Sequence, residues 1–278
     1  MGYIKTTSKD RNEYINIYYE DDGQGQPVVL VHGWPLSGKM FEYQKREIIE
    51  AGFRCITYDR RGFGKSDRPW NGYDYDCMAQ DLNDLINGLH LEDVILLGFS
   101  MGGGELGRYV GKYGTKKLSK LVFLSSIAPF MLKTDDNPDG VPSETLEGFK
   151  NAIKKDRLGF LGDFGNNFVN YDENKDKVSE KQVHFNWMIA ANASPKATLD
   201  CIDTFAKTDL REDLKKIDIP CLFVHGDKDN VVPIDPTAKQ GHKIVKNSKL
   251  EIIKDAPHGC VFTHTKEVNK ILLDFFKS

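Results

Sequence analysis

The run VILLGFSMGGG, residues 94–104, decides how the rest of the sequence is interpreted. Its apolar first half is typical of a buried strand, and residues 105–112 after it are helix-forming with a mixed apolar face. Between the two lies the pattern G-x-S-x-G, centred on Ser100. Glycines two positions on either side permit a tight strand-to-helix turn, which presents its serine at a helix N-terminus, where free amides favour negative charge. The pattern predicts either a nucleophile or a serine that caps a glycine-rich helix.

The composition is that of an ordinary globular protein. Of the 278 residues, 40% are hydrophobic and 28% are charged, which is enough apolar content for a substantial core. The formal net charge is −3, and the basic residues are scattered or alternate with acidic ones rather than forming a basic field. We therefore expect no nucleic-acid partner.

The sequence indicates a cytoplasmic protein without a membrane anchor, metal or other cofactor. No apolar stretch reaches the roughly 18 residues of a membrane helix, and residues 1–10 are polar and strand-like rather than a signal peptide. The five cysteines are widely spaced with no C-x-x-C, so neither a disulfide framework nor a zinc knuckle is indicated. No H-E-x-x-H or comparable ligand spacing occurs, and the glycine clusters fit neither a dinucleotide fingerprint nor a P-loop.

Strands and helices alternate along most of the chain. Residues 3–8 and 14–21 predict two strands joined by a polar turn at 9–12. Six further apolar runs indicate strands, and apolar residues at helical spacing indicate helices between most of them. The strands are expected at 28–31, 55–58, 94–97, 118–125, 221–224 and 250–253, and the helices at 37–50, 75–90, 105–112, 235–245 and 266–276. This alternation predicts an α/β protein with a doubly wound, mostly parallel sheet of eight strands.

The alternation is interrupted between the sixth and seventh strands. Residues 128–207 contain no strand-like run and many apolar and aromatic side chains. We interpret this segment as a helical lid inserted into one sheet domain, whose two parts are residues 1–127 and 208–278. Most of the lid aromatics are expected to pack the base of the lid, and a few to line a pocket.

Partners for Ser100 follow the last two strands. A serine nucleophile needs a base, and the base needs an orienting acid. The strand at 221–224 is followed by Asp227 and Asp229, and the last strand is followed by His258. The chain order is therefore Ser, Asp, His, as in hydrolases built on this strand–turn–helix motif. The remaining histidines are not expected to be catalytic: His32, His90, His184, His225, His242 and His264. Of these, His32 and His225 end strands beside glycines and are expected to have a hydrogen-bonded structural role.

These motifs together resemble one group of proteins. The chain is similar to α/β-hydrolases, and within them to the cofactor-free bacterial haloperoxidases, perhydrolases and arylesterases. The similarity spans the whole chain and rests on HGWPLSG at 32–38, YDRRGFGKSDRPW at 58–70, GFSMGGGELGRYV at 98–110, APFMLKTDDNPDGVP at 128–142, DLKKIDIPCLFVHGDKDNVVPI at 213–234 and APHG at 256–259.

The resemblance implies a role for each candidate residue. Ser100 would be the nucleophile and His258 the general base and acid. The group's G-D-x-D pattern has its triad carboxylate at the second aspartate, which favours Asp229 and leaves Asp227 to cap a turn.

An oxyanion hole is expected beside the serine. The backbone amides of Trp34 and Met101 would form it, as in hydrolases with this motif. Pro35 has no amide hydrogen and would instead shape the loop that presents Trp34. In the group that the chain resembles, a proline after this tryptophan accompanies efficient use of hydrogen peroxide as acyl acceptor.

The predicted function is that of a serine carboxylesterase for small esters. The acyl-enzyme on Ser100 would be released by water, or by hydrogen peroxide to give a peracid that oxidises chloride or bromide without a cofactor. A lactamase or amidase, a cofactor-independent lyase and a non-catalytic small-molecule-binding protein remain as alternatives, because each can keep the same triad. A carboxylate-dependent dehalogenase or epoxide hydrolase is excluded by the serine at position 100. Relatives in the group commonly form homo-oligomers.

Overall fold

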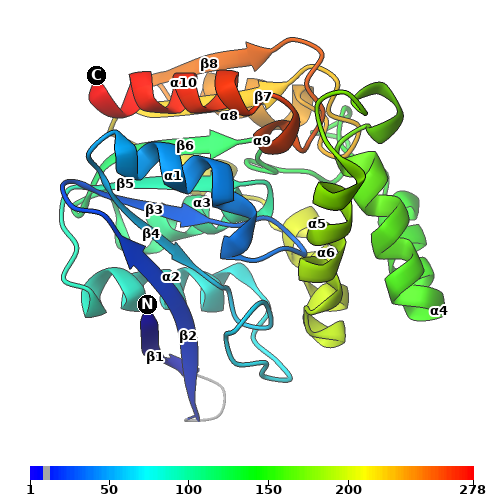
Figure 1. Ribbon diagram of the computed structural model, residues 1–278, viewed down its shortest axis with the longest axis horizontal. Helices are drawn as coiled ribbons and strands as arrows, with labels where there is room; N and C mark the ends of the chain where they lie inside the picture. The colour runs from blue at the N-terminus through cyan, green and yellow to red at the C-terminus, as the bar shows by residue number, and fades with distance from the viewer. Residues whose placement is uncertain (9–12) are drawn as a thin grey trace.

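One sheet of eight strands forms the centre of the computed structural model, which describes residues 1–8 and 13–278 (Figure 1). The strand order is β1-β2-β4-β3-β5-β6-β7-β8, with β1 and β2 antiparallel and the others parallel. The bounds are β1 (Gly2–Ser8), β2 (Glu13–Asp22), β3 (Pro27–Val31), β4 (Arg54–Tyr58), β5 (Val94–Phe99), β6 (Leu118–Leu124), β7 (Cys221–Gly226) and β8 (Ser248–Ile253). The predicted fold class is confirmed, and the turn expected at 9–12 lies outside the described residues.

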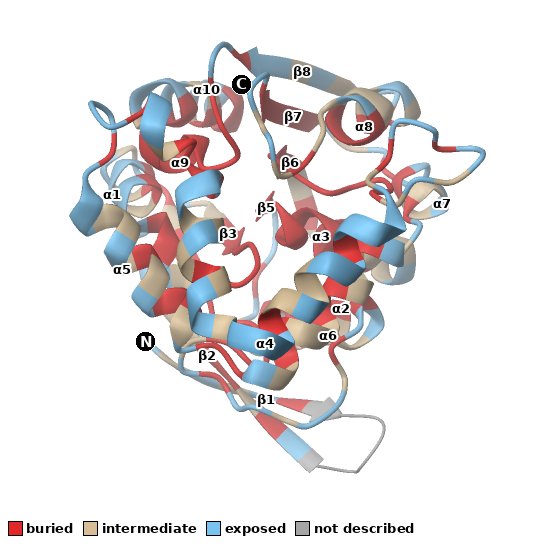
Figure 2. Ribbon diagram, turned by 90° about the vertical axis from the view of Figure 1, so that its right-hand side faces the viewer, coloured by how far each residue is buried: buried red, intermediate tan, exposed pale blue. Residues whose placement is uncertain are grey.

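Helices cover both faces of the sheet. One face carries α1 (Glu42–Glu50), α9 (Cys260–Thr263) and α10 (Thr265–Lys277), and the other carries α2 (Tyr75–Gly88), α3 (Met101–Tyr113), α7 (Arg211–Leu214) and α8 (Gln240–Ile244) (Figure 2). Because both faces are covered, every residue of β5 is buried, as its continuous apolar run requires. In the described part of the chain, no helix is long and apolar enough to cross a lipid bilayer.

Two predicted helices differ from the structure. The helix expected over 37–50 is divided into a 3₁₀ turn, η1 (Gly38–Phe41), and α1, because the Ser37 side chain caps a short tight turn before the longer helix begins. The helix expected over 235–245 starts as a π-helical turn, η3 (Asp235–Lys239), with a proline in its first turn, and continues as α8. Local capping therefore changes the helix type without changing the layer.

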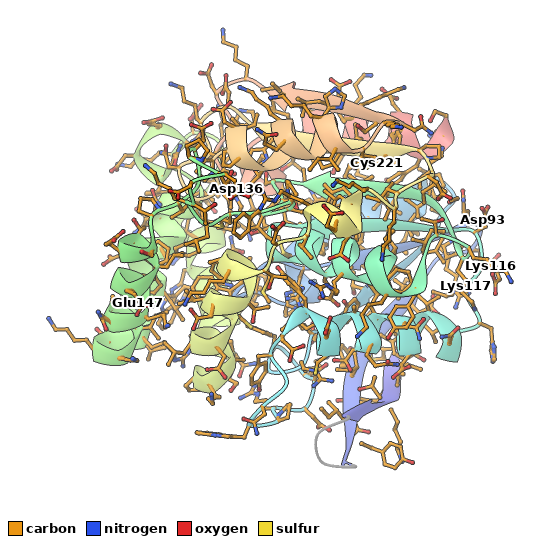
Figure 3. All side chains as sticks on the ribbon, turned by 180° about the vertical axis from the view of Figure 1, so that it is seen from behind. Asp93, Lys116, Lys117, Asp136, Glu147 and Cys221 are labelled. Atoms are coloured by element: carbon orange, nitrogen blue, oxygen red, sulfur yellow. The ribbon has the colours of Figure 1, made fainter. Side chains whose placement is uncertain are left out.

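Residues between β6 and β7 form a separate group of helices at the carboxyl ends of the strands (Figures 1 and 2). They are α4 (Ser143–Phe168), the short η2 (Tyr171–Glu173), α5 (Glu180–Ala191) and α6 (Pro195–Lys207). Figure 3 shows Asp136 and Glu147 at this end of the molecule, and Asp93, Lys116 and Lys117 at the opposite end, where β5 and β6 begin. The inserted helices thus stand over the edge at which Ser100 lies.

A buried ion pair joins Arg61 to Asp81 of α2, and Asp81 also accepts a hydrogen bond from β1. Arg61 donates two hydrogen bonds to Asp81, at 2.6 and 2.7 Å, and Thr6 of β1 donates a third at 2.7 Å. The side chains of Arg61 and Asp81 are 0% and 1% exposed. Each charge therefore depends on its partner, because neither is solvated by water.

We predict that Asp81→Ala lowers the free energy of unfolding by about 3–5 kcal/mol, since it leaves the Arg61 guanidinium buried without its counter-ion. Urea-induced unfolding followed by tryptophan fluorescence measures this change. The double variant Arg61→Met/Asp81→Leu removes both charges and is expected to recover most of the loss. A double variant no more stable than Asp81→Ala would contradict the explanation.

Candidate active site

Ser100 lies in a strained turn between β5 and α3. Its backbone φ is 54°, a value that residues other than glycine rarely adopt. A Cβ at Gly102 would lie 2.3 Å from the Val31 carbonyl oxygen, and one at Gly98 would lie 2.7 Å from the backbone of Gly102. Side chains at these positions would push α3 away from β3 and β5, which is the physical reason for the two glycines around Ser100.

The structure brings Ser100, His258 and Asp229 into one chain of hydrogen bonds. The His258 Nε2 atom lies 2.9 Å from the Ser100 Oγ atom, and its Nδ1 atom lies 2.7 Å from Asp229 Oδ2. The three side chains follow β5, β8 and β7, so they meet at the carboxyl edge of the sheet. With Nδ1–H donating to the carboxylate, Nε2 is free to accept the proton of the serine hydroxyl.

Only one of the two candidate aspartates lies beside His258. The second oxygen of Asp229 accepts hydrogen bonds from the backbone amides of Val231 and Val232, at 2.9 and 2.7 Å. Asp227 instead accepts a hydrogen bond of 2.6 Å from the Asp255 amide. It thereby joins the turns that follow β7 and β8, in keeping with the turn role expected for it.

The charge on Asp229 is stabilised by its surroundings. Burial by itself would raise the pKa of this carboxyl, but the neighbouring imidazoles of His258 and His225 and the hydrogen bonds from them hold its pKa well below the usual range. The carboxylate therefore stays ionised at neutral pH. It can stabilise the imidazolium that forms when His258 takes a proton.

His225 is a second imidazole against the same carboxylate. Its Nε2 atom lies 3.2 Å from Asp229 Oδ2 and 2.9 Å from the Val232 carbonyl oxygen. Its buried Nδ1 atom has no hydrogen-bond partner among the described residues. The sequence predicted a structural role for His225, but it carried no signal that the turn after β7 folds back onto this ring.

Trp34 and Met101 line an apolar cavity together with Ser100. The turn that precedes Trp34 touches the serine, since a Cβ at Gly33 would lie 3.1 Å from the Ser100 Cβ atom. Both residues predicted to supply oxyanion-hole amides are therefore at the serine. Pro35 lines a neighbouring cavity and not that of Ser100.

Three aromatic residues from the helices between β6 and β7 also line the cavity at Ser100. Phe149 and Phe164 come from α4, and Phe205 comes from α6. Trp34 packs against Phe164 and Phe205, with ring centroids 5.3 and 5.6 Å apart. The sequence predicted that a few aromatic residues of this segment would line a pocket, but it did not identify which ones.

A buried charged network supports the turn that carries Trp34. Arg60 donates to the His32 carbonyl oxygen at 2.8 Å and to Glu105 of α3 at 2.7 Å. The hydroxyl of Tyr58 donates to the other oxygen of Glu105. Burial and the nearby guanidinium lower the pKa of His32, which is therefore neutral. These contacts fix the turn relative to the helix that begins after Ser100, and sequence spacing alone did not indicate them.

In the part of the chain that the structure describes, no group of three or more His, Cys, Asp or Glu side chains could hold a metal ion. Burial raises the pKa of Cys260, two residues after His258, to about 12, so this thiol stays protonated and is a weak nucleophile.

The family model described as the alpha/beta hydrolase fold matches residues 26–265. Over the whole of both chains, the sequence is 45% identical to a putative non-heme chloroperoxidase of Synechocystis sp. and 37% identical to a bifunctional esterase/perhydrolase of Acinetobacter calcoaceticus. The crystal structure of a bromoperoxidase from Bacillus anthracis is 49% identical and superimposes with a TM-score of 0.95, again over all of both chains.

The chain is therefore an enzyme of the α/β-hydrolase family. Within that family it belongs with the non-heme haloperoxidases and esterases, as the sequence motifs predicted.

The two aspartates provide a matched test of the hydrogen-bonded chain. We predict that Asp229→Asn lowers kcat for an acetate ester by about 10⁴, because the amide favours the wrong imidazole tautomer. Asp227→Asn, the control, removes a charge but keeps the oxygen that accepts from the Asp255 amide, and should lower kcat less than tenfold. Steady-state kinetics measure both, and equal losses in the two variants would contradict the assignment.

A second prediction concerns His225. In His225→Phe the carboxylate loses a hydrogen-bond donor that lowers its pKa, so the His258–Asp229 pair holds a proton more tightly. The acid limb of the kcat/KM profile is therefore expected to move to higher pH. His225→Gln can keep a donor at the Nε2 position and should leave the limb near that of the unchanged enzyme. Superimposable profiles for the Phe variant and the unchanged enzyme would show that His225 does not act on the pair.

Proposed function

We propose that the enzyme is a serine carboxylesterase that acts on small esters through an acyl-enzyme, with hydrogen peroxide as an alternative acyl acceptor. The observation that carries this proposal is the chain of hydrogen bonds from Ser100 through His258 to Asp229 beside an apolar cavity. It is supported by the relative that is a bifunctional esterase/perhydrolase and by the haloperoxidase relatives.

In the proposed acylation step, His258 Nε2 removes the hydroxyl proton as Ser100 Oγ bonds to the ester carbonyl carbon. The tetrahedral intermediate collapses when the bond from that carbon to the alkoxy oxygen breaks. The alcohol then leaves with the proton from His258. We assign the backbone amides of Trp34 and Met101 to the oxyanion, because both residues line the cavity at the serine.

In deacylation, His258 activates either water or hydrogen peroxide against the acyl carbon. Water releases the carboxylic acid, and hydrogen peroxide releases the peracid, which carries one more oxygen atom. A peracid transfers that oxygen to bromide, giving a carboxylate and hypobromous acid. Halide oxidation therefore needs no electron-transfer group in the protein.

The segment 128–207 acts in this proposal as a lid over the core segments 1–127 and 208–278. Its support is that α4 and α6 contribute Phe149, Phe164 and Phe205 to the cavity at Ser100. Pro35 shapes the loop that carries Trp34.

We further propose a cytoplasmic location and a homo-oligomeric state, with small esters and hydrogen peroxide as the reactants. The five cysteines, none of which forms a disulfide, suit a reducing compartment.

We predict that Ser100→Ala lowers kcat for ester hydrolysis by about 10⁶ and abolishes peroxide-dependent bromination as well. Both reactions pass through the same acyl-enzyme, so both depend on the same oxygen atom. Release of p-nitrophenol and bromination of monochlorodimedone measure the two activities. Ser119→Ala, at the opposite end of the sheet, is the control, and survival of either activity in Ser100→Ala would refute the mechanism.

A further inference from the structure

Two apolar cavities lie on either side of one aromatic ring. The first is the cavity at Ser100, and the second lies between Pro35 and Ala190. Each has a volume of about 20 Å³, room for about one water molecule. Of the residues that line them, only Phe164 belongs to both walls.

Neither cavity alone can hold an ester. Sites for small molecules usually have volumes of roughly 300–1,000 Å³. Substrate entry therefore requires a wall of the Ser100 cavity to move. A movement of Phe164 would join the Ser100 cavity to existing apolar space, whereas a movement of Phe149 would only enlarge the first cavity.

The ring of Phe164 is held by contacts with other aromatic side chains. The side chain is half-buried, and its ring lies 5.3–6.3 Å, centroid to centroid, from the rings of Trp34, Phe149, Phe160 and Phe168. The next residue, Gly165, lines the second cavity and adds no side chain to it. No hydrogen bond fixes the ring, because phenylalanine has no polar atom.

The second cavity suits a hydrocarbon chain. Its walls include the apolar side chains of Leu36, Leu161, Phe168 and Ala190. They also include Asn186, whose side-chain oxygen accepts a hydrogen bond from Gln182. On its outer side Trp187 also borders a groove of about 520 Å³ between α4 and α5. The second cavity therefore shares Phe164 with the Ser100 cavity and Trp187 with this groove.

We propose that the second cavity binds the distal part of an unbranched alkyl chain of the ester, and that the ring of Phe164 controls access to it from Ser100. This inference rests on the proposed esterase function and names its substrate class. With the ring as it stands, the second cavity is closed off from Ser100 and contributes nothing to ester binding. Once the ring is displaced, a longer chain enters the second cavity and gains apolar contact there.

Phe164→Ala tests the proposal by joining the two cavities permanently. The measured quantity is the ratio of kcat/KM for p-nitrophenyl octanoate to that for p-nitrophenyl acetate. We expect this ratio to rise about tenfold or more, the order expected for burying two further methylene groups. A parallel series of alkyl acetates shows whether the chain belongs to the acyl group or to the alcohol.

Phe149→Ala is the matched control, because it removes an equal side chain from the Ser100 cavity without opening the second one. It should raise the ratio far less. Phe164→Ala/Ala190→Leu and Phe164→Ala/Leu161→Phe refill the second cavity from two different helices and should each reverse the gain. Thermal unfolding identifies any variant that is not folded. If one of the two refilled variants is unfolded, the ratio measured for the other one tests whether refilling reverses the gain.

Three results would overturn the proposal. They are an unchanged ratio in both ester series for folded Phe164→Ala, an equal gain in Phe149→Ala, or a gain that persists after refilling. If the unchanged enzyme does not hydrolyse p-nitrophenyl acetate, the proposed esterase function itself has failed. Acetate hydrolysis without a shift in the ratio is a failure of this inference alone.

Discussion

The contact between α3 and the end of β3 is the constraint on which the active site depends. The Gly102 backbone lies so close to the Val31 carbonyl that no side chain fits between them. This contact sets the strained conformation of Ser100 and places the serine against the turn that carries Trp34. The nucleophile and the proposed oxyanion hole therefore come from two neighbouring strands whose relative position is fixed by backbone packing.

Buried charged groups hold the nucleophile turn, the turn after β3 and the imidazole in fixed positions relative to one another. Arg60 donates to the His32 carbonyl in the turn after β3 and pairs with Glu105 on α3, so one side chain joins the two segments that meet at the serine. On the other side, Asp229 is ionised within the protein and directs His258 towards Ser100. Charges that are removed from water need such partners. Each network therefore ties the geometry of the site to the stability of the fold.

Much of this arrangement could be predicted from the sequence. Apolar runs predicted the positions of the strands. Because parallel strands end at one edge of a sheet, residues that follow them were predicted to meet there, as Ser100, Asp229 and His258 do. The prediction failed where helix type depends on local capping, as over residues 37–50. The approach of His225 to Asp229 and the position of Phe164 between two cavities were not predictable. Both depend on how turns and inserted helices pack in three dimensions, which leaves no periodic signal in the sequence.

The central claim is that water and hydrogen peroxide attack one and the same acyl-enzyme on Ser100. The most direct measurement is the ratio of peracid to carboxylic acid formed from several acetate esters that differ only in their alcohol, at one fixed peroxide concentration. If the alcohol leaves before the acceptor attacks, every ester yields the same acetyl-enzyme, and the account predicts the same ratio for all of them. A ratio that changes with the leaving alcohol would contradict it.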